Sequence, residues 1–178
     1  MPRHIVLLRG INIGPRNRVA MPALRERLTA AGLHEVTTYL QSGNVVLSSD
    51  ASATEVADRC RAEIAAGFGL DFAVVTRTRD ELAAVVALNP LGEAALDPKR
   101  YQVSFLAGEL PAATVDKLTA ALSPPEQLVI AGREVYVWHP EGVARSPLWA
   151  QLGGPRLGVT ATARNWTTVT SLLALAAA

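Results

Sequence analysis

The sequence has a single cysteine and no long apolar run, and each shortage excludes a class of protein. Cys60 alone can neither form an internal disulfide nor supply a zinc cage. Apolar stretches such as 172–178 are far shorter than the roughly 20 residues of a membrane-spanning helix. No secretory leader pattern opens the chain. We therefore expect a cytoplasmic globular protein with no membrane partner.

Positive and negative residues nearly balance over the whole chain but are unevenly distributed along it. The 178 residues are 49% hydrophobic and 19% charged with a net charge of +1, which excludes a disordered chain. Lysine occurs twice and arginine fifteen times, which we interpret as a genome-composition bias. The segments before Glu26 and after Glu141 carry eight arginines and no acid, so they form a basic face if they meet in space. Chance segregation of solvated arginines is the alternative.

The first half of the chain has the element order of a split βαβ arrangement. A continuous apolar run, Pro and Gly at helix ends, a Ser52-x-x-Glu55 capping box and a Gln41–Asn44 turn mark its elements. They predict strands over 4–13, 36–40, 45–49 and 72–76 and helices over 22–31 and 52–68. This β-α-β-β-α-β order is typical of ferredoxin-like folds.

The second half repeats that order except for its last strand. The same signals predict helices over 78–89, 111–122, 146–152 and 162–176 and strands over 101–107, 128–131 and 135–139. We therefore predict an α+β fold of two ferredoxin-like (βαββαβ-type) halves, pseudo-duplicated, with an extra C-terminal helix. The halves are expected at 1–78 and 79–178, packed together as one compact unit.

The first of three polar clusters runs from Arg9 through Asn12 to Arg18. It joins a strand to a helix, where backbone N–H groups and the helix dipole favour anions. It is neither a Walker A loop nor a dinucleotide fingerprint, because the lysine of the former and the third glycine of the latter are missing. A long turn with solvated arginines is the alternative.

The other two clusters have equally good structural explanations. Gln41-Ser42-Gly43-Asn44 is turn chemistry, and Ser42 has no nearby base that would make it a nucleophile. In the segment 160–166, Thr162 or Asn165 can cap the last helix, which leaves Arg164 as a cation near a helix N-terminus. A cation there is unfavourable unless an anion or an acid offsets it.

The remaining chemistry-bearing residues do not form a recognisable site. His4, His34 and His139 share no ligand spacing, so we expect no metal and no cofactor. Cys60 lies on an apolar helix stripe with Val56 and Ile64 and is interpreted as a core thiol.

The three clusters together resemble a bacterial family known as domain of unknown function 1697. The resemblance rests on LLRGINIG at 7–14, TYLQSGNVV at 38–46 and TARNWTTV at 162–169. It implies an α+β fold with ferredoxin-like halves but no activity, because the family has none assigned. Residues 15–18 here are Pro-Arg-Asn-Arg, where members often carry glycine and lysine.

The sequence is most consistent with a protein that binds a phosphate-bearing small molecule or nucleic acid on a basic, asparagine-rich surface. The candidate ligand-binding residues are Arg9, Asn12, Arg18, Gln41, Ser42, Asn44, Arg164 and Asn165. An enzyme that stabilises an anionic substrate electrostatically, without a metal, is the first alternative. An oligomeric structural or interaction protein is the second. We expect the three clusters to lie close together, although the ferredoxin-like order alone does not guarantee it.

Overall fold

The structure, a computed structural model, describes residues 1–178 and separates into two units. The first unit comprises residues 1–84 and 171–178, and the second comprises residues 85–170. Helices α3 (Arg79–Leu88) and α6 (Trp166–Ala177) contribute residues to both units. None of the helices combines the length and the apolar character that crossing a membrane requires.

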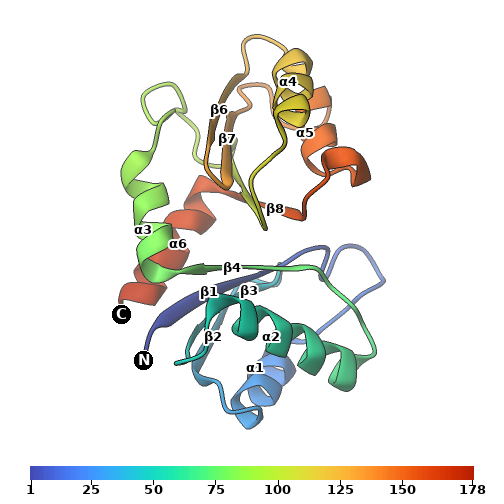
Figure 1. Ribbon diagram of the computed structural model, residues 1–178, viewed down its shortest axis with the longest axis vertical. Helices are drawn as coiled ribbons and strands as arrows, with labels where there is room; N and C mark the ends of the chain where they lie inside the picture. The colour runs from blue at the N-terminus through green and yellow to red at the C-terminus, as the bar shows by residue number, and fades with distance from the viewer. The chain divides into compact units, whose positions relative to one another are not determined.

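The first unit is a four-stranded antiparallel sheet with two helices on one face (Figure 1). Its elements are β1 (Arg3–Leu8), α1 (Met21–Ala30), β2 (His34–Tyr39), β3 (Asn44–Ser48), α2 (Ala53–Phe68) and β4 (Val74–Thr78). The strand order β2-β3-β1-β4 with these connections is that of a ferredoxin-like fold. The predicted order of elements in this half is confirmed.

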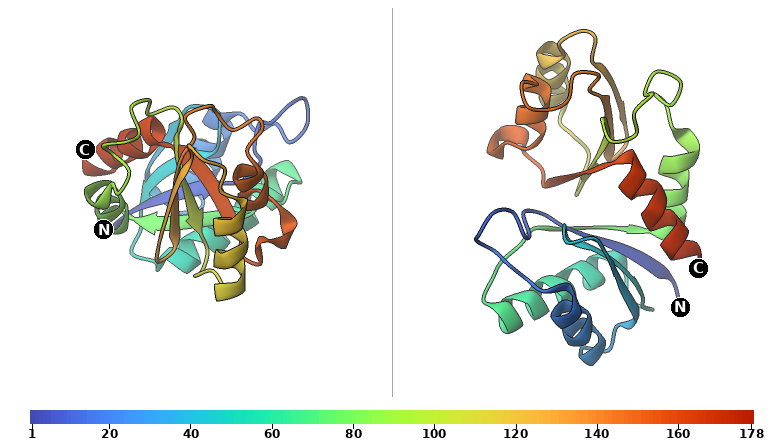
Figure 2. Two further views of the ribbon diagram at one scale, coloured as in Figure 1. Left: turned by 90° about the horizontal axis from the view of Figure 1, so that it is seen from above. Right: turned by 180° about the vertical axis from the view of Figure 1, so that it is seen from behind.

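The second unit has the same architecture, a sheet with helices on one face (Figure 2). Its strand order, β6-β7-β5-β8, is the equivalent one. Its elements are β5 (Tyr101–Leu106), α4 (Ala112–Ala121), β6 (Gln127–Ala131), β7 (Glu134–Trp138), α5 (Pro147–Leu152), the short 3₁₀ helix η1 (Pro155–Leu157) and β8 (Ala161–Asn165). The α+β fold class with two βαββαβ-type halves and an additional C-terminal helix is therefore confirmed.

The predicted start of the last helix is wrong, because residues 161–165 form strand β8. This segment pairs antiparallel with β5, so that Arg164 lies opposite Val103 and Asn165 opposite Gln102. The residues before Trp166 look like a helix start in the sequence. In the fold, however, they lie at a sheet edge, where β5 supplies backbone hydrogen-bond partners from far along the chain. The helix begins at Trp166, and the Asn165 side chain caps it by accepting a hydrogen bond from the Thr168 N–H at 2.9 Å.

Local capping signals predicted other helix starts correctly. Ser52 and Glu55 form the reciprocal capping box of α2, with hydrogen bonds of 3.2 and 2.8 Å. Thr78 and Glu81 make the same pair of bonds at the start of α3. These interactions join residues three positions apart, so the sequence alone contains both partners.

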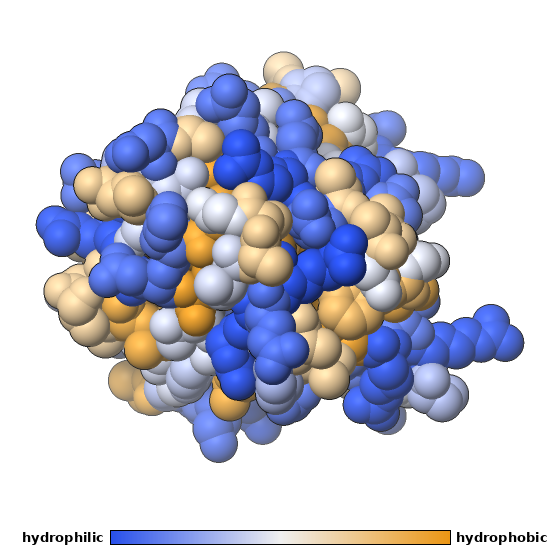
Figure 3. Space-filling view, turned by 90° about the horizontal axis from the view of Figure 1, so that it is seen from below, coloured by the Kyte–Doolittle hydropathy of each residue, from blue (hydrophilic) through white to orange (hydrophobic).

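Each unit buries its own apolar cluster between the sheet and its helices. In the first unit the cluster includes Val6 and Leu8 of β1 and Val56, Cys60 and Ile64 of α2. The second unit has a corresponding cluster, which includes Leu106, Leu118, Val135, Val137, Leu148 and Leu152. On the outer side of α1 and α2, hydrophilic side chains alternate with small apolar patches (Figure 3). This distribution follows from helices that turn one apolar stripe toward a sheet.

We expect the substitution Cys60→Ser to lower the free energy of unfolding by about 1–3 kcal/mol, because the new hydroxyl would be buried without an assured partner. Cys60 is 1% exposed, and burial raises the pKa of its thiol to about 12. Denaturant titration measures the change, with Ala66→Ser on the exposed face of α2 as the control. Rapid reaction of the native thiol with a bulky reagent would contradict the core assignment.

Candidate functional site

Two of the three polar clusters lie against each other at one end of the first sheet. The β1–α1 loop (residues 9–20) leaves β1 beside the β2–β3 turn (residues 40–43), because the last residue of β1, Leu8, donates its N–H to the Gly43 carbonyl at 2.9 Å. The Asn12 Nδ2 group links the loop itself to the turn by donating to the Gln41 carbonyl at 2.7 Å. The two meet because β1 pairs antiparallel with β3, which places the end of one strand beside the start of the other.

The Asn12 side chain shapes the β1–α1 loop. Its Oδ1 atom accepts a hydrogen bond from the Val19 N–H at 2.8 Å, and its Nδ2 group donates to the Val19 carbonyl at 3.0 Å. The backbone of Asn12 is left-handed, with φ of 55°. Both amide hydrogens are thus used on backbone carbonyls of Val19 and Gln41. Asn12, a candidate ligand residue, holds the loop in place.

The turn of the β2–β3 hairpin is tightly packed against its neighbours. Gly43 has a left-handed backbone with φ of 81°, and a Cβ atom there would lie 2.4 Å from Ile11 Cγ2. The neighbouring Asn44 is fully buried, and its Nδ2 group donates to the Tyr39 carbonyl at 3.1 Å and to Ser42 Oγ at 3.0 Å. Asn44 therefore closes the hairpin from within.

The side chains that remain on the outside of these two segments are basic or neutral. We call residues 9–20 and 40–44 the loop surface. It carries three arginines, Arg9, Arg16 and Arg18, and no acidic residue. Arg16 and Arg18 are exposed and Arg9 is half-buried, and Gln41 and Ser42 are exposed on the adjoining turn. Arg16 was not among the residues singled out from the sequence, although it belongs to the same acid-free run.

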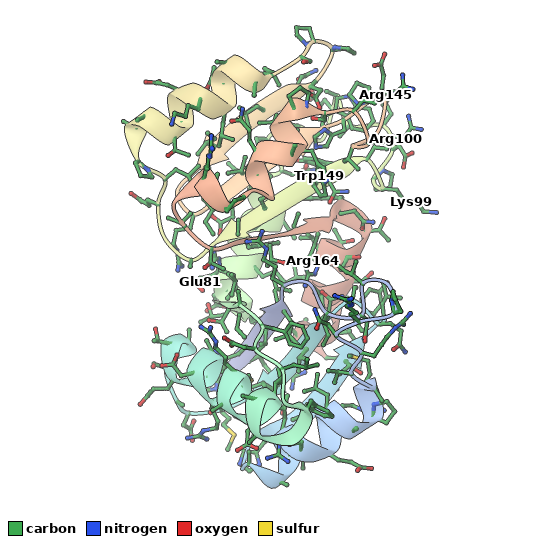
Figure 4. The ribbon with its side chains drawn as sticks, turned by 90° about the vertical axis from the view of Figure 1, so that its right-hand side faces the viewer. Glu81, Lys99, Arg100, Arg145, Trp149 and Arg164 are labelled. Atoms are coloured by element: carbon green, nitrogen blue, oxygen red, sulfur yellow. The ribbon has the colours of Figure 1, made fainter.

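The third cluster lies in the second unit, and its arginine is not the exposed cation that the sequence suggested. Arg164 is 9% exposed and donates hydrogen bonds to Thr162 Oγ1 at 2.7 Å and to the Ala163 carbonyl at 2.8 Å. Burial lowers the pKa of Arg164 to about 10, so the guanidinium stays protonated at neutral pH. Arg164 lies in strand β8, two residues before α6 begins, so it is near a helix N-terminus as expected but is buried (Figure 4).

The neighbours of Arg164 serve the fold of the second unit. Asn165 caps α6, and the Trp166 ring stacks on Tyr101 with centroids 4.7 Å apart. That residues 164–166 share one site with the loop surface stays a prediction, as does a basic face made by the two ends of the chain. No group of three or more His, Cys, Asp or Glu side chains is placed to hold a metal ion.

Comparison with known proteins identifies a family and a fold. Residues 1–136 match the family described as "Protein of unknown function (DUF1697)". The match contains the first two motifs of the resemblance, and the third lies beyond it. No curated protein matches the chain. The solved structure of the conserved bacterial protein SP0830 from Streptococcus pneumoniae is similar, with a TM-score of 0.80 at 22% identity over 98% of both chains.

We expect Gly43→Ala to destabilise the protein by about 2–4 kcal/mol, because strain at positive φ adds to overlap with Ile11 and Leu8. Gly14→Ala is the matched control, since Gly14 has φ of 65° but no atom within 4 Å of its missing Cβ. It should cost only the conformational strain, about 1–2 kcal/mol. Equal losses in thermal or denaturant unfolding would show that the close packing at Gly43 is unimportant.

We expect Arg164→Ala to lower the free energy of unfolding by about 1.5–3 kcal/mol, the scale of hydrogen bonds made by a charged group. Arg156→Ala, at an exposed position in the same unit, should change it by less than about 0.5 kcal/mol. Urea unfolding of both variants measures the difference. If both substitutions change the unfolding free energy equally little, Arg164 does not stabilise the fold and stays a candidate for ligand binding.

Proposed function

We propose that this chain, which belongs to the DUF1697 family of proteins of unknown function, binds a phosphate-bearing ligand, a nucleotide or nucleic acid, on the loop surface. The observation that carries the proposal is the joining of two acid-free segments by the Asn12 side chain. Three arginines are presented there on a backbone that is already ordered. Ligand binding therefore does not require the loop to fold first.

The charge of the loop surface is local. The whole chain has a net charge of +1, whereas the loop surface alone carries Arg9, Arg16 and Arg18 without an acid. Guanidinium groups suit phosphate because they can donate two parallel hydrogen bonds to its oxygens. A local concentration of positive charge attracts anions even when the net charge is small. These features favour an anionic ligand at this end of the sheet.

The backbone of the loop supports the same proposal. Gly10, Asn12, Gly14 and Asn17 all have left-handed backbone conformations, with φ between 55° and 78°. Left-handed turns can group backbone N–H groups around an anion. The Asn12 N–H is bonded to the Asn17 carbonyl at 3.0 Å, so other N–H groups of the loop would serve. The exposed Gln41 and Ser42 supply neutral hydrogen-bonding groups beside it.

The phosphate is expected to be recognised more strongly than the base that it carries. Aromatic residues make up 5% of the chain, so stacking of many bases on aromatic rings is disfavoured. We therefore expect little discrimination among nucleotides of equal charge. Duplex DNA should bind weakly at physiological salt, because only a few arginines are available to contact its backbone. Submicromolar duplex binding would instead assign the surface to nucleic acid.

The test is a titration of the isotopically labelled protein with ATP and with pyrophosphate, followed by the amide resonances of residues 9–20 and 40–44. Arg16→Ala and Arg18→Ala should each weaken binding by about 10- to 100-fold, the equivalent of one charged hydrogen bond. Neither substitution should lower the unfolding free energy by more than about 0.5 kcal/mol, since both side chains are exposed.

Arg59→Ala is the control for this titration, because Arg59 is an exposed arginine on α2 outside the loop surface. It should leave the affinity unchanged. The proposal is wrong if Arg59→Ala weakens binding as much as the loop variants do. The proposal is also wrong if neither ATP nor pyrophosphate shifts the loop resonances at a ligand concentration of about 10 mM, because binding weaker than that is not specific.

A further inference from the structure

A cavity in the second unit lies between the turn after α4 and the segment that follows β7. Its volume is about 340 Å³. It is lined by Ser123, Pro124, Pro125, Glu126, Pro140, Glu141, Gly142, Ala144, Arg145 and Ser146. Three prolines give it rigid apolar walls, and the charged residues that line it are Glu126, Glu141 and Arg145. None of these residues belongs to the clusters found in the sequence.

The Glu126 carboxylate is the most buried charged group of the cavity, with 9% of its side chain exposed. Its Oε2 atom accepts two hydrogen bonds of 2.6 Å, from His139 Nδ1 and from Ser146 Oγ. Its Oε1 atom has a single long contact, 3.3 Å from the Ser123 N–H. Oε2 is therefore saturated, while Oε1 retains capacity for a stronger donor.

The donors that surround Glu126 are neutral at neutral pH. Burial lowers the pKa of His139, and its hydrogen bond with Glu126 does not reverse the shift. The proton of this neutral ring is on Nδ1, because that atom faces the carboxylate, and Nε2 is buried without a partner. Burial acts to raise the pKa of Glu126, but the hydrogen bonds from Ser146, His139 and Ser123 outweigh it and keep the pKa low.

Glu126 is thus a buried anion without a cationic partner. No lysine or arginine forms an ion pair with it, and its three donors are an imidazole, a hydroxyl and a backbone N–H. A buried charge of this kind is stabilised most by an opposite charge at hydrogen-bond distance. The open side of the cavity is the direction from which such a cation can come.

The cavity also has a basic side chain in its lining. The exposed Arg145 belongs to its lining, and Arg145, Arg100 and Lys99 lie along the same side of the second unit (Figure 4). Arg100 also donates a hydrogen bond to the carbonyl of Pro140, another lining residue. Glu141 is a second acid of the lining, and Arg100, outside the lining, pairs with Asp97 at 3.8 Å. Arg145 is therefore the one cation of the lining, and a ligand with only positive groups would leave it without an anion.

We propose that this cavity binds a small zwitterion of the amino-acid type, whose ammonium group contacts Glu126 and whose carboxylate contacts Arg145. The ammonium supplies the missing counter-charge at Oε1, and the carboxylate pairs with the guanidinium at the entrance. The three prolines contact the carbon chain between the two groups. This site uses none of the residues of the loop surface, so it stands or falls independently of the phosphate-binding proposal.

The test compares three probes of similar chain length by calorimetry and by amide chemical shifts: δ-aminovalerate, cadaverine and glutarate. The zwitterion δ-aminovalerate should bind about tenfold more tightly than the diamine cadaverine or the dianion glutarate, because only it satisfies both charges. The amide resonances that move should be those of residues 123–126 and 141–146. Equal or tighter binding of either other probe overturns the proposal, as does the absence of shifts at about 10 mM zwitterion.

Two variants locate the charged groups. Arg145→Ala should weaken δ-aminovalerate about tenfold while leaving the fold intact, since Arg145 is exposed. Glu126→Gln keeps the shape of the side chain and should abolish preference for an ammonium-bearing probe. Glu109→Gln, an exposed acid in the same unit, is the control and should change neither. Unchanged affinity in Arg145→Ala overturns the proposal even if Glu126→Gln proves too unstable to measure.

Discussion

The antiparallel pairing of β1 with β3 is the constraint on which the candidate site of the first unit depends. The pairing sets Leu7 opposite Asn44, so the loop that leaves β1 and the turn that enters β3 come out of the sheet side by side. The loop residues are then held by Asn12, whose amide group takes the place of backbone partners that a long loop lacks. This backbone carries the three arginines of the loop surface.

The protein also buries charged and titratable side chains, and it does so in both units. Arg77 of β4 is 1% exposed and donates a hydrogen bond to the Thr76 carbonyl, and Arg164 of β8 is 9% exposed and bonded to Thr162 and Ala163. Burying a charge is costly unless hydrogen bonds replace its water. At Glu126 that replacement comes from His139 and Ser146, which are neutral donors. Arg77, Arg164 and Glu126 are thus charged groups held in the fold by hydrogen bonds.

The polar residues that attracted notice in the sequence divide into two kinds in the structure. Asn12, Asn44 and Asn165 bond to backbone or to close neighbours, so they explain why the motifs have these residues at those positions. Arg18 in the β1–α1 loop and Gln41 in the adjoining β2–β3 turn are exposed and could contact a ligand. The sequence motif therefore marks the place of a candidate site, while the side chains that shape it and those that could contact a ligand are different residues.

What the sequence by itself determined are the features that join near neighbours in the chain: the capping boxes at Ser52 and Thr78, the hairpin at Gln41–Asn44 and the apolar stripe with Cys60. Strand β8, the burial of Arg164 and the meeting of Glu126 with His139 were decided only by the tertiary structure. The physical reason is the range of the partners. A cap finds its partner three residues away, whereas β8 needs a strand some sixty residues earlier. Glu126 needs His139, directly after β7, and Ser146 at the start of α5.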